Sequence, residues 1–373
     1  MANGRNPPLV GAIPYPLSFL FPLDATAPNT GMFKRIIIEP CNLQTFDQNI
    51  NKELDREQKD KFISLINNYN SIFSQHEFDL GHNETYPFKI DTGDARPIKQ
   101  RAYRTSHSNK EIIYKKIQEL LSLGVIEKSY SHWASPVIIF KNKDGSNRMC
   151  VDYRKLNEVT KKNSYPLPLI DETFDTIGRA RYFTKIDLAK GFYQFSVDPE
   201  SREKTAIITH LGLFQFKRIT FSLYNAPINF QRKMDEILGE VKNECVLVFI
   251  DDIICYSADL DSHLVHLKKV FKCLSRANLK IKLNKCQFAM TQVEFLGFSI
   301  KEGHLIPQKS KVDKILKIPV PVNRKQVRSF LGVVGYYIQI VFSCSRGSQN
   351  LGPRYQKMAR KHIFLLCSVV LHH

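Results

Sequence analysis

The stretch Val246-Leu-Val-Phe-Ile-Asp-Asp-Ile-Ile-Cys-Tyr-Ser257 places two adjacent aspartates between two apolar runs. This pattern predicts a strand, a tight turn at Asp251 and Asp252, and a returning strand. Turn tips usually carry Asn-Gly or Asp-Gly, because those residues tolerate positive φ. Two carboxylates at a tip repel each other unless a cation lies beside them. The sequence therefore predicts a divalent metal at this turn, and Mg²⁺ is the first candidate because it prefers carboxylate oxygens.

The net charge of the chain points to a polyanionic partner. Its 373 residues include 54 Lys and Arg against 36 Asp and Glu, a formal charge of +18. Such an excess suits nucleic acid or an anionic membrane surface. The basic residues are spread along the chain, which favours a long charged groove over a disordered arm. The length allows two or three compact regions, each with its own core.

Cysteine spacing and hydropathy exclude several classes of protein. The eight cysteines contain no C-x-x-C pair, so zinc-site spacing is absent and we expect free thiols in a reducing compartment. No window reaches 18 consecutive apolar residues, so no transmembrane helix and no membrane partner are expected. The apolar run Leu17–Leu23 is broken by proline and lacks a small-residue cleavage pattern, so we do not interpret it as a signal peptide.

Strands and helices are expected to alternate irregularly, with hairpins, in an α+β fold. The expected helices lie within 51–75, from Ser108 with a capping box to a stop at Gly124, near 171–177, from an N-cap at Asn225, from Asp261, and over 308–338. The expected strands are 137–140 and 149–153 around a tip at 143–146, 182–186 ending at Asp187, 193–197, 206–209, 213–217 and 293–300 with a turn at 302–303. No internal repeat is present.

Two further sets of residues suggest chemistry without deciding it. Lys141, Lys143 and Arg148 lie on one hairpin; they form either an ordinary exposed basic ribbon or a clamp for a triphosphate. Asp187 at a strand end is by itself most often a turn or cap residue. Together with the two turn aspartates, however, it gives three carboxylates, which can hold the two metal ions that polymerases use.

From about Asp79 to Ile340 the chain resembles the reverse transcriptase of a gypsy-type long-terminal-repeat retrotransposon Pol polyprotein. The matching segments are 90–98, 124–127, 133–137, 143–146, 150–157, 165–168, 183–194, 202–206, 212–216, 225–232, 249–254 and 294–298. The resemblance implies a right-hand polymerase with fingers, a palm whose antiparallel sheet is backed by helices, and a partial thumb.

The resemblance also implies domain boundaries. The fingers are expected at 101–175, the palm at 176–301 with an inserted part of the fingers at 195–225, and the start of the thumb at 302–340. We expect a poorly ordered segment at 1–33 and an N-terminal extension or linker with one helix at 34–100. Residues 341–373 carry no family motif, and we interpret them as a tail from a shifted reading frame.

Carried over residue by residue, the resemblance assigns roles. It implies a metal-binding catalytic triad with a neighbouring backbone carbonyl, a steric gate against ribonucleotides, cationic and aromatic contacts to the nucleotide, and a primer grip. The triad is Asp187, Asp251 and Asp252, with the carbonyl of Leu188, and the steric gate is Phe192. The nucleotide contacts are Arg148, Lys141 or Lys143, and Phe221. The primer grip is Phe295, Leu296, Gly297 and Phe298. It implies two Mg²⁺ ions, replaceable by Mn²⁺, with an RNA or DNA template, a primer and dNTPs as partners.

The expected function is RNA-directed DNA polymerase activity inside the cell, in the cytoplasm, a virus-like particle or the nucleus. The chain departs from the family pattern at Ser222, where a glycine is usual, at Ile228-Asn229, and in its short thumb. One alternative is therefore a catalytically impaired remnant that only binds nucleic acid; another is a structural hairpin that binds no metal. RNase H, integrase and protease regions are not expected in this sequence.

Overall fold

The structure is a computed structural model that describes residues 48–76, 79–141, 145–177, 180–301, 304–319 and 321–344. They belong to one compact unit, Pro40–His373. The expectations for residues 1–33, for Leu17–Leu23, for Lys143 and for most of the tail fall outside the described residues.

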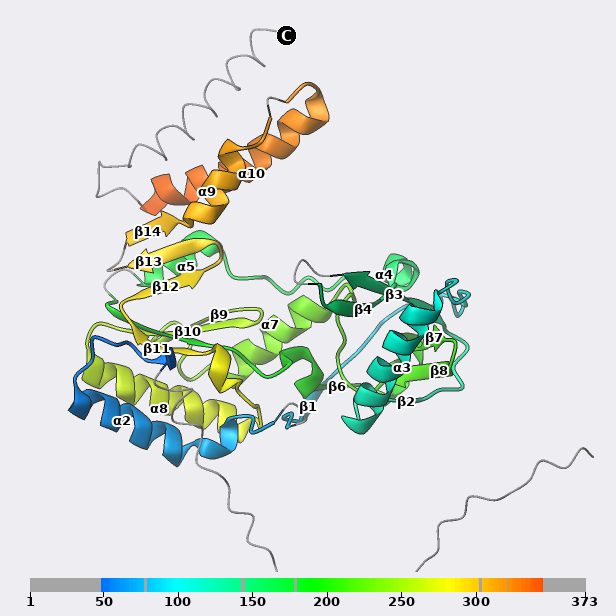
Figure 1. The fold of residues 1–373 in the computed structure, drawn as a ribbon, viewed down its shortest axis with the longest axis horizontal. Helices are drawn as coiled ribbons and strands as arrows, with labels where there is room; N and C mark the ends of the chain where they lie inside the picture. The colour runs from blue at the N-terminus through cyan, green and yellow to red at the C-terminus, as the bar shows by residue number, and fades with distance from the viewer. Residues whose placement is uncertain are drawn as a thin grey trace, which may run out of the picture. The chain divides into compact units, whose positions relative to one another are not determined.

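The aspartate hairpin lies in the central antiparallel sheet, whose strand order is β11-β5-β10-β9. β9 (Val246–Phe249) and β10 (Asp252–Ser257) pair around the turn, with Asp252 opposite Phe249. β5 (Tyr182–Ile186) pairs with the other edge of β10, and β11 (Gln287–Met290) pairs with β5. The β9–β10 hairpin (Figure 1) and the strand that ends just before Asp187 are therefore confirmed. The turn lies one residue earlier than predicted, at Ile250 and Asp251, because Asp252 already pairs with Phe249.

Three helices support this sheet. α7 (Ala226–Ile237) contacts β9, α8 (Leu260–Arg276) contacts β10 and β5, and α2 (Arg56–Asn68) lies against α8 (Figure 1). The inner face of α8 buries Leu267, Val270, Phe271 and Leu274. α8 begins just after Asp259, whose side chain accepts a hydrogen bond from the Ser262 amide at 2.9 Å. The predicted start at Asp261 is thus one residue late, because Asp259 is the N-cap and Leu260 the first helical residue.

A second sheet has the strand order β2-β8-β7-β3-β4. Its strands are β2 (Ile126–Lys128), β3 (Ser135–Lys141), β4 (Asn147–Val151), β7 (Ile207–Thr209) and β8 (Gly212–Phe216). α3 (His107–Ser122) contacts β2 and β4, and α4 (Arg154–Val159) follows β4. The capping box predicted at Ser108 is wrong, because Ser106 is the N-cap and accepts from the Asn109 amide. The stop at Gly124 is confirmed by its φ of 62°.

A third sheet, β12-β13-β14, consists of Gln292–Phe295, Phe298–Lys301 and His304–Pro307. The prediction of one strand over 293–300 is wrong. Leu296 and Gly297 both have positive φ, 49° and 87°, so the chain reverses there in a tight hairpin turn. The helix predicted over 308–338 is also divided, into α9 (Lys309–Leu316) and α10 (Arg324–Cys344). Pro319 and Pro321 lie between them and cannot continue a helix.

The remaining elements connect these sheets. They are η1 (Asn70–Ile72), β1 (Asn83–Phe88), α5 (Ile170–Ile177), η2 (Gly191–Gln194), β6 (Phe195–Val197), α6 (Pro199–Arg202), η3 (Glu203–Thr205) and η4 (Leu283–Lys285). The helix expected within 51–75 ends at Asn68 and continues as η1. Asn225 lies at the predicted N-cap of α7, but its amide makes no capping bond and instead joins the backbone of Lys161 and Asn163.

The described ranges also bear on the cysteines and on the hydropathy of the helices. Cys150, Cys245, Cys255, Cys273 and Cys286 are free cysteines. No helix in those ranges combines the length and the apolar character needed to cross a bilayer.

A fully buried histidine joins α8 to the central sheet. His263 lies between the Thr184 hydroxyl, 2.7 Å from Nε2, and the Ser257 hydroxyl, 3.0 Å from Nδ1. Ser257 also contacts His266 at 2.7 Å. Burial, with a smaller contribution from the charge of His266, lowers the pKa of His263 to about 3, and Asp259 opposes this shift weakly. The fold therefore requires the neutral imidazole.

We expect His263 to make the fold sensitive to acid. Its folded pKa lies below its unfolded value, so the stabilisation is complete above pH 6.5 and is lost as the pH falls toward 3. The free energy of unfolding should fall by about 1.4 kcal/mol per pH unit in this range from this group alone. Denaturant titrations at several pH values should show a shallower slope for His263→Gln. His107→Gln, at an exposed site, should keep the wild-type slope, and an unchanged slope in His263→Gln would contradict the assignment.

Candidate active site

Strand register brings the three predicted aspartates together. Ile186 lies opposite Ile253 in the β5–β10 pair, so Asp187, the next residue, comes opposite Asp252. Asp251 occupies the turn that leads into β10. The three side chains are close enough for the charges of Asp187 and Asp252 to act on Asp251. The site thus combines one strand end with a turn more than sixty residues later in the sequence.

Two carboxyl groups of this cluster, those of Asp251 and Asp187, have raised pKa values and are harder to ionise than exposed ones. Burial raises the pKa of Asp251 to about 6, and the charges of Asp252 and Asp187 add to the shift. Burial also raises the pKa of Asp187, against the opposing charges of Lys285 and Lys185. Like charges and loss of water are the two causes expected for carboxylates that share a site. A cation placed among them would remove this penalty.

Two lysines neutralise part of this charge. Lys185 Nζ lies 2.7 Å from Asp252 Oδ1, and Lys285 Nζ lies 3.7 Å from Asp187 Oδ1. Lys185 precedes Asp187 by two residues on β5, so the two side chains share one face of the strand. Sequence reasoning missed both lysines, although strand alternation alone could have placed Lys185 beside the aspartates.

The turn itself is strained and held by one buried side chain. Ile250 has a φ of 54°, a conformation that costs free energy for a β-branched residue. Its amide donates to Gln231 Oε1 at 2.7 Å, and Gln231 is fully buried on α7. The Gln231 amide nitrogen donates to the Val248 carbonyl and to Asp235 Oδ1. Gln231 therefore joins the end of β9 and the first residue of the turn to the supporting helix.

Asp235 fixes the orientation of that amide. A carboxylate only accepts hydrogen bonds, so the Gln231 nitrogen must face Asp235 and its oxygen must face Ile250. Asp235 is itself held by the Tyr165 hydroxyl at 2.7 Å and by Lys242 Nζ at 2.8 Å. Sequence analysis missed Gln231; the available signal was a polar residue on the buried face of α7, four positions before an aspartate.

Phe192, Phe221 and Arg148 form a second cluster from three separate segments. The ring centroids of Phe192 and Phe221 are 5.0 Å apart, and Arg148 Cζ lies 5.4 Å from the Phe221 centroid. Phe230 supports Phe192 from below at 4.8 Å. Phe192 is 5% exposed, whereas Phe221 is 40% exposed. An aromatic surface with a guanidinium above it thus faces solvent.

Lys141 lies on the opposite face of the β3–β4 ribbon from Arg148 and is not part of this cluster. In the β3–β4 ribbon, Phe140 pairs with Arg148 and Lys141 pairs with Asn147. Successive side chains of a strand point to opposite faces, so Lys141 and Arg148 leave the ribbon on opposite sides. The structure brings Arg148 to Phe221 without Lys141.

The predicted primer-grip residues form the β12–β13 hairpin. Phe295 and Phe298 are buried at 1% and 0% exposure and pack against Phe174 at ring distances of 6.2 and 5.4 Å. Leu296 and Gly297 form the tip of the turn. Only the tip, therefore, is placed to contact a ligand, while the two phenylalanines anchor it.

The donor set suits a hard divalent cation. Three carboxylates supply oxygen ligands of the kind that Mg²⁺ prefers, and two of them have raised pKa values that a cation would relieve. Across the described ranges, however, no three His, Cys, Asp or Glu side chains converge as a ready-made metal cluster. Asp252 and Asp187 are instead paired with Lys185 and Lys285.

Comparison with known families identifies the central part of the chain. Residues 139–300 match the family "Reverse transcriptase (RNA-dependent DNA polymerase)". This chain contains a reverse transcriptase domain. The match contains Asp187, Asp251 and Asp252, and also Phe192 and Arg148.

The reverse transcriptase domain is related to those of retrotransposon Pol polyproteins. The retrovirus-related Pol polyprotein from transposon 297 of Drosophila melanogaster is 37% identical over 293 residues, which are 77% of this chain and 28% of that protein. The Pol polyprotein from transposon gypsy of the same organism is 33% identical over 75% of this chain and 28% of its own length. The chain thus spans little more than a quarter of these relatives.

Solved structures agree with this relationship. The foamy viral protease–reverse transcriptase in complex with an RNA/DNA hybrid aligns with a TM-score of 0.70 at 25% identity, over 87% of this chain and 46% of that one. The same viral protein in complex with double-stranded DNA gives a TM-score of 0.70 and covers 71% of that chain. The right-hand polymerase fold expected from the sequence is confirmed.

A second family match lies where no protease region was expected. Residues 36–111 match the family "Spumavirus aspartic protease (A9)". Aspartic proteases use two carboxyl groups that share one proton. Within this range the carboxylate of Asp91 is instead paired with Lys161 at 3.0 Å, and the Gly93 amide and Lys161 lower its pKa. We therefore draw no proteolytic function from the match.

Ser222 occupies a position that suits glycine. Its φ is 74°, in the left-handed region, where a side chain is strained. The loop is held by Asn157, which donates to the Ser222 carbonyl at 2.8 Å and accepts from the Tyr224 amide at 2.9 Å. Ser222 directly follows Phe221, so this strain lies beside the aromatic cluster.

We expect Ser222→Gly to stabilise the chain. Removing the left-handed strain should raise the free energy of unfolding by up to about 1 kcal/mol, after the greater freedom of glycine in the unfolded chain is subtracted. Denaturant midpoints measure the change. Ser122→Gly at the end of α3 is the matched control and should destabilise. A loss of stability in Ser222→Gly would mean that the serine side chain compensates for the strain.

Proposed function

We propose that the chain is an RNA-directed DNA polymerase that adds dNTPs to the 3′-hydroxyl of a primer. The observation that carries the proposal is the pairing of β5 with the β9–β10 hairpin, which gathers Asp187, Asp251 and Asp252 at one end of the central sheet. The reverse transcriptase family match over the same residues supports it. The solved relatives that hold an RNA/DNA hybrid and double-stranded DNA favour a template–primer as the partner.

The aspartates would hold two Mg²⁺ ions, for which Mn²⁺ can substitute, with the Leu188 carbonyl nearby. Such ions, when bound, activate the attacking 3′-oxygen and stabilise the leaving pyrophosphate. The chain's own contribution is to hold three carboxylates together against their repulsion, by Gln231 at the turn and by the register of β5 with β10. Lys185 and Lys285 would release their aspartates as cations enter.

The aromatic cluster would receive the incoming nucleotide. Arg148 can bind phosphate oxygens in a bidentate manner, and Lys143 of the same hairpin is the second candidate. Phe192, supported by Phe230, would press against the sugar and exclude a 2′-hydroxyl. The formal charge of +18 would hold the nucleic-acid backbone. We place this activity inside the cell, in the cytoplasm, a virus-like particle or the nucleus.

We expect primer extension to depend on Asp251. On a poly(rA) template with an oligo(dT) primer and Mg²⁺, Asp251→Asn should reduce the rate by about 1000-fold, because it removes several kcal/mol of metal-dependent stabilisation. Asp94→Asn, at an exposed turn, should keep the wild-type rate. Undiminished extension by Asp251→Asn would refute the assignment. A wild-type chain that shifts the template–primer in a gel but does not extend it would instead be the impaired binding remnant.

We expect Phe192 to set the choice of sugar. Phe192→Ala opens space beside Phe221 and Phe230, so the preference for dNTPs over rNTPs in kcat/KM should fall by about 10- to 200-fold, the range for one steric contact. Phe192→Tyr keeps the bulk and should retain the preference. Equal sugar discrimination in the wild type and Phe192→Ala would remove the steric-gate role.

A further inference from the structure

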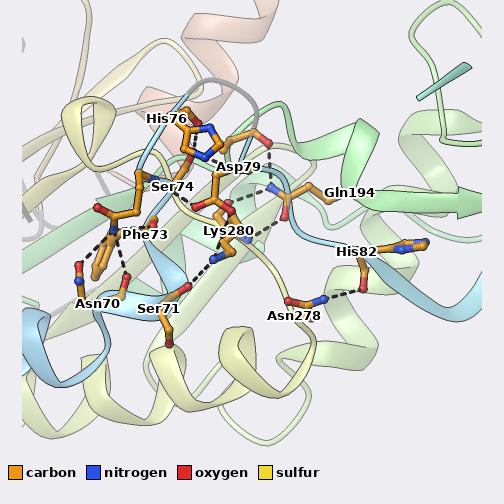
Figure 2. Close-up of polar contacts among 12 residues, drawn as sticks. Asn70, Ser71, Phe73, Ser74, His76, Asp79, His82, Gln194, Asn278 and Lys280 are labelled. Atoms are coloured by element: carbon orange, nitrogen blue, oxygen red, sulfur yellow. Dashed lines mark hydrogen bonds and ion pairs between the residues drawn. The ribbon is translucent and has the colours of Figure 1, made fainter. Parts of the chain in front are cut away.

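A segment from the N-terminal side of the reverse transcriptase match is hydrogen-bonded into the backbone beside Asp187. We call it the N-terminal strap and define it as residues 70–76 and 79–83. It lies against residues 278–282, which follow α8 (Figure 2). The strap is outside the range 139–300 that matches the polymerase family, and none of the roles assigned above involves it.

The segment Lys280–Lys282 is a shared strand between the strap and the catalytic aspartate. On one edge, Ile281 forms a parallel bridge with Phe73; its amide donates to Ile72 O at 2.7 Å, and its carbonyl accepts from Ser74 N at 2.9 Å. On the other edge, Ile281 forms an antiparallel bridge with Leu188.

The second edge fixes the backbone on both sides of Leu188. The Lys282 amide donates to the Asp187 carbonyl at 2.8 Å, and the Ala189 amide donates to the Lys280 carbonyl at 2.9 Å. Asp187 and Leu188 are the residues expected to present a carboxylate and a carbonyl to the metal. Their backbone position is therefore set by the strand to which the strap is paired.

The side chain of Gln194 binds the backbone where Lys280–Lys282 meets the segment after Asp187. This fully buried side chain accepts from the Lys280 amide at 2.7 Å and donates to the carbonyls of Lys280 and Ala189, both at 2.8 Å. Figure 2 shows its amide directed at Lys280. One side chain thus binds both backbone groups of Lys280 and one carbonyl of the loop after Asp187.

The strap is closely fitted to this junction. Lys280 Nζ donates to the Ser71 carbonyl at 2.6 Å and pairs with Asp79 at 3.4 Å. The Asn278 amide donates to the His82 carbonyl at 3.1 Å, and the His82 backbone amide donates to Asn278 O at 3.1 Å. Gly81 lies so close that a Cβ atom there would collide with Asn278 O and Gln194 Oε1. Only glycine fits at this position.

We propose that the N-terminal strap is a positioning element of the metal site, acting on Asp187 and Leu188 through Lys280–Lys282 and Gln194. This inference rests on the proposed polymerase function. Ligands held by an outer layer of hydrogen bonds lose metal affinity when that layer is disturbed. The strap would therefore be needed for metal binding although it contributes no ligand.

The test measures Mn²⁺ binding by the full chain, from the electron paramagnetic resonance signal of free Mn²⁺. Gly81→Ala pushes on Gln194 and should weaken Mn²⁺ binding by about 10-fold. Lys280→Met removes the two side-chain contacts to the strap but keeps the backbone ladder, and should show a smaller loss in the same direction. The matched controls are Gly332→Ala on α10, where a Cβ meets nothing, and Lys268→Met on the exposed face of α8. Both controls should bind Mn²⁺ like the wild type.

Primer extension supplies the second readout. In the two strap variants the Mg²⁺ concentration for half-maximal rate should rise, while the KM for template–primer stays unchanged. A general loss of folded protein would lower the rate but would leave both the Mg²⁺ requirement and this KM unchanged. If Gly81→Ala does not fold, Lys280→Met decides. Folded variants with wild-type Mn²⁺ affinity, or a wild-type chain that binds no Mn²⁺, would overturn the inference. A wild-type chain that binds Mn²⁺ but extends no primer would contradict the polymerase proposal and leave the role of the strap in metal binding standing.

Discussion

The mutual repulsion of Asp187, Asp251 and Asp252 is the constraint on which the rest of the site depends. Burial and like charge raise the pKa values of Asp251 and Asp187. Holding the ionised carboxylates together therefore lowers the stability of the folded chain. This cost is offset by elements that have little freedom to move. They are antiparallel strands in fixed register and a turn whose strained Ile250 is held by the buried Gln231. The three carboxylates are thus held together by the fold itself, which is the arrangement that the proposed metal binding requires.

The same constraint explains why so many contacts concern the backbone rather than the carboxylates. A carboxylate on a mobile strand end would turn away from its neighbours. At Asp187 the carbonyl is bound by Lys282, and the next residues are tied to Lys280 and Gln194. At the turn, Gln231 binds the Ile250 amide and is oriented by Asp235. Both sides of the site are thus supported by uncharged amides, which fix the backbone without occupying the carboxylate oxygens.

The cluster of Phe192, Phe221 and Arg148 is built from weaker and more exposed contacts than the aspartate site. Phe221 is part of a loop that Asn157 holds through two hydrogen bonds, and Arg148 reaches it from a hairpin ribbon. Ser222 strains this loop at the point where it meets the aromatic cluster. This strain therefore lies beside the aromatic cluster, in a segment separate from the strands that carry the three aspartates.

The sequence by itself determined the local elements whose signal is a short repeating pattern. The apolar runs around Asp251 and Asp252 predicted the hairpin, the strand before Asp187 was placed correctly, and the pairing of β3 with β4 was expected. Local signals failed where two nearby residues were equally good candidates for an N-cap, as with Ser106 and Ser108. They also failed where one residue interrupted an apolar strand pattern, as Gly297 does between β12 and β13. Tertiary structure alone decided which distant groups meet. Gln231 with Ile250, Lys185 with Asp252, and Gly81 with Gln194 are pairs separated by 19 to more than 100 residues. No periodicity encodes such pairs, because strand register and packing fix them only once the whole sheet has formed.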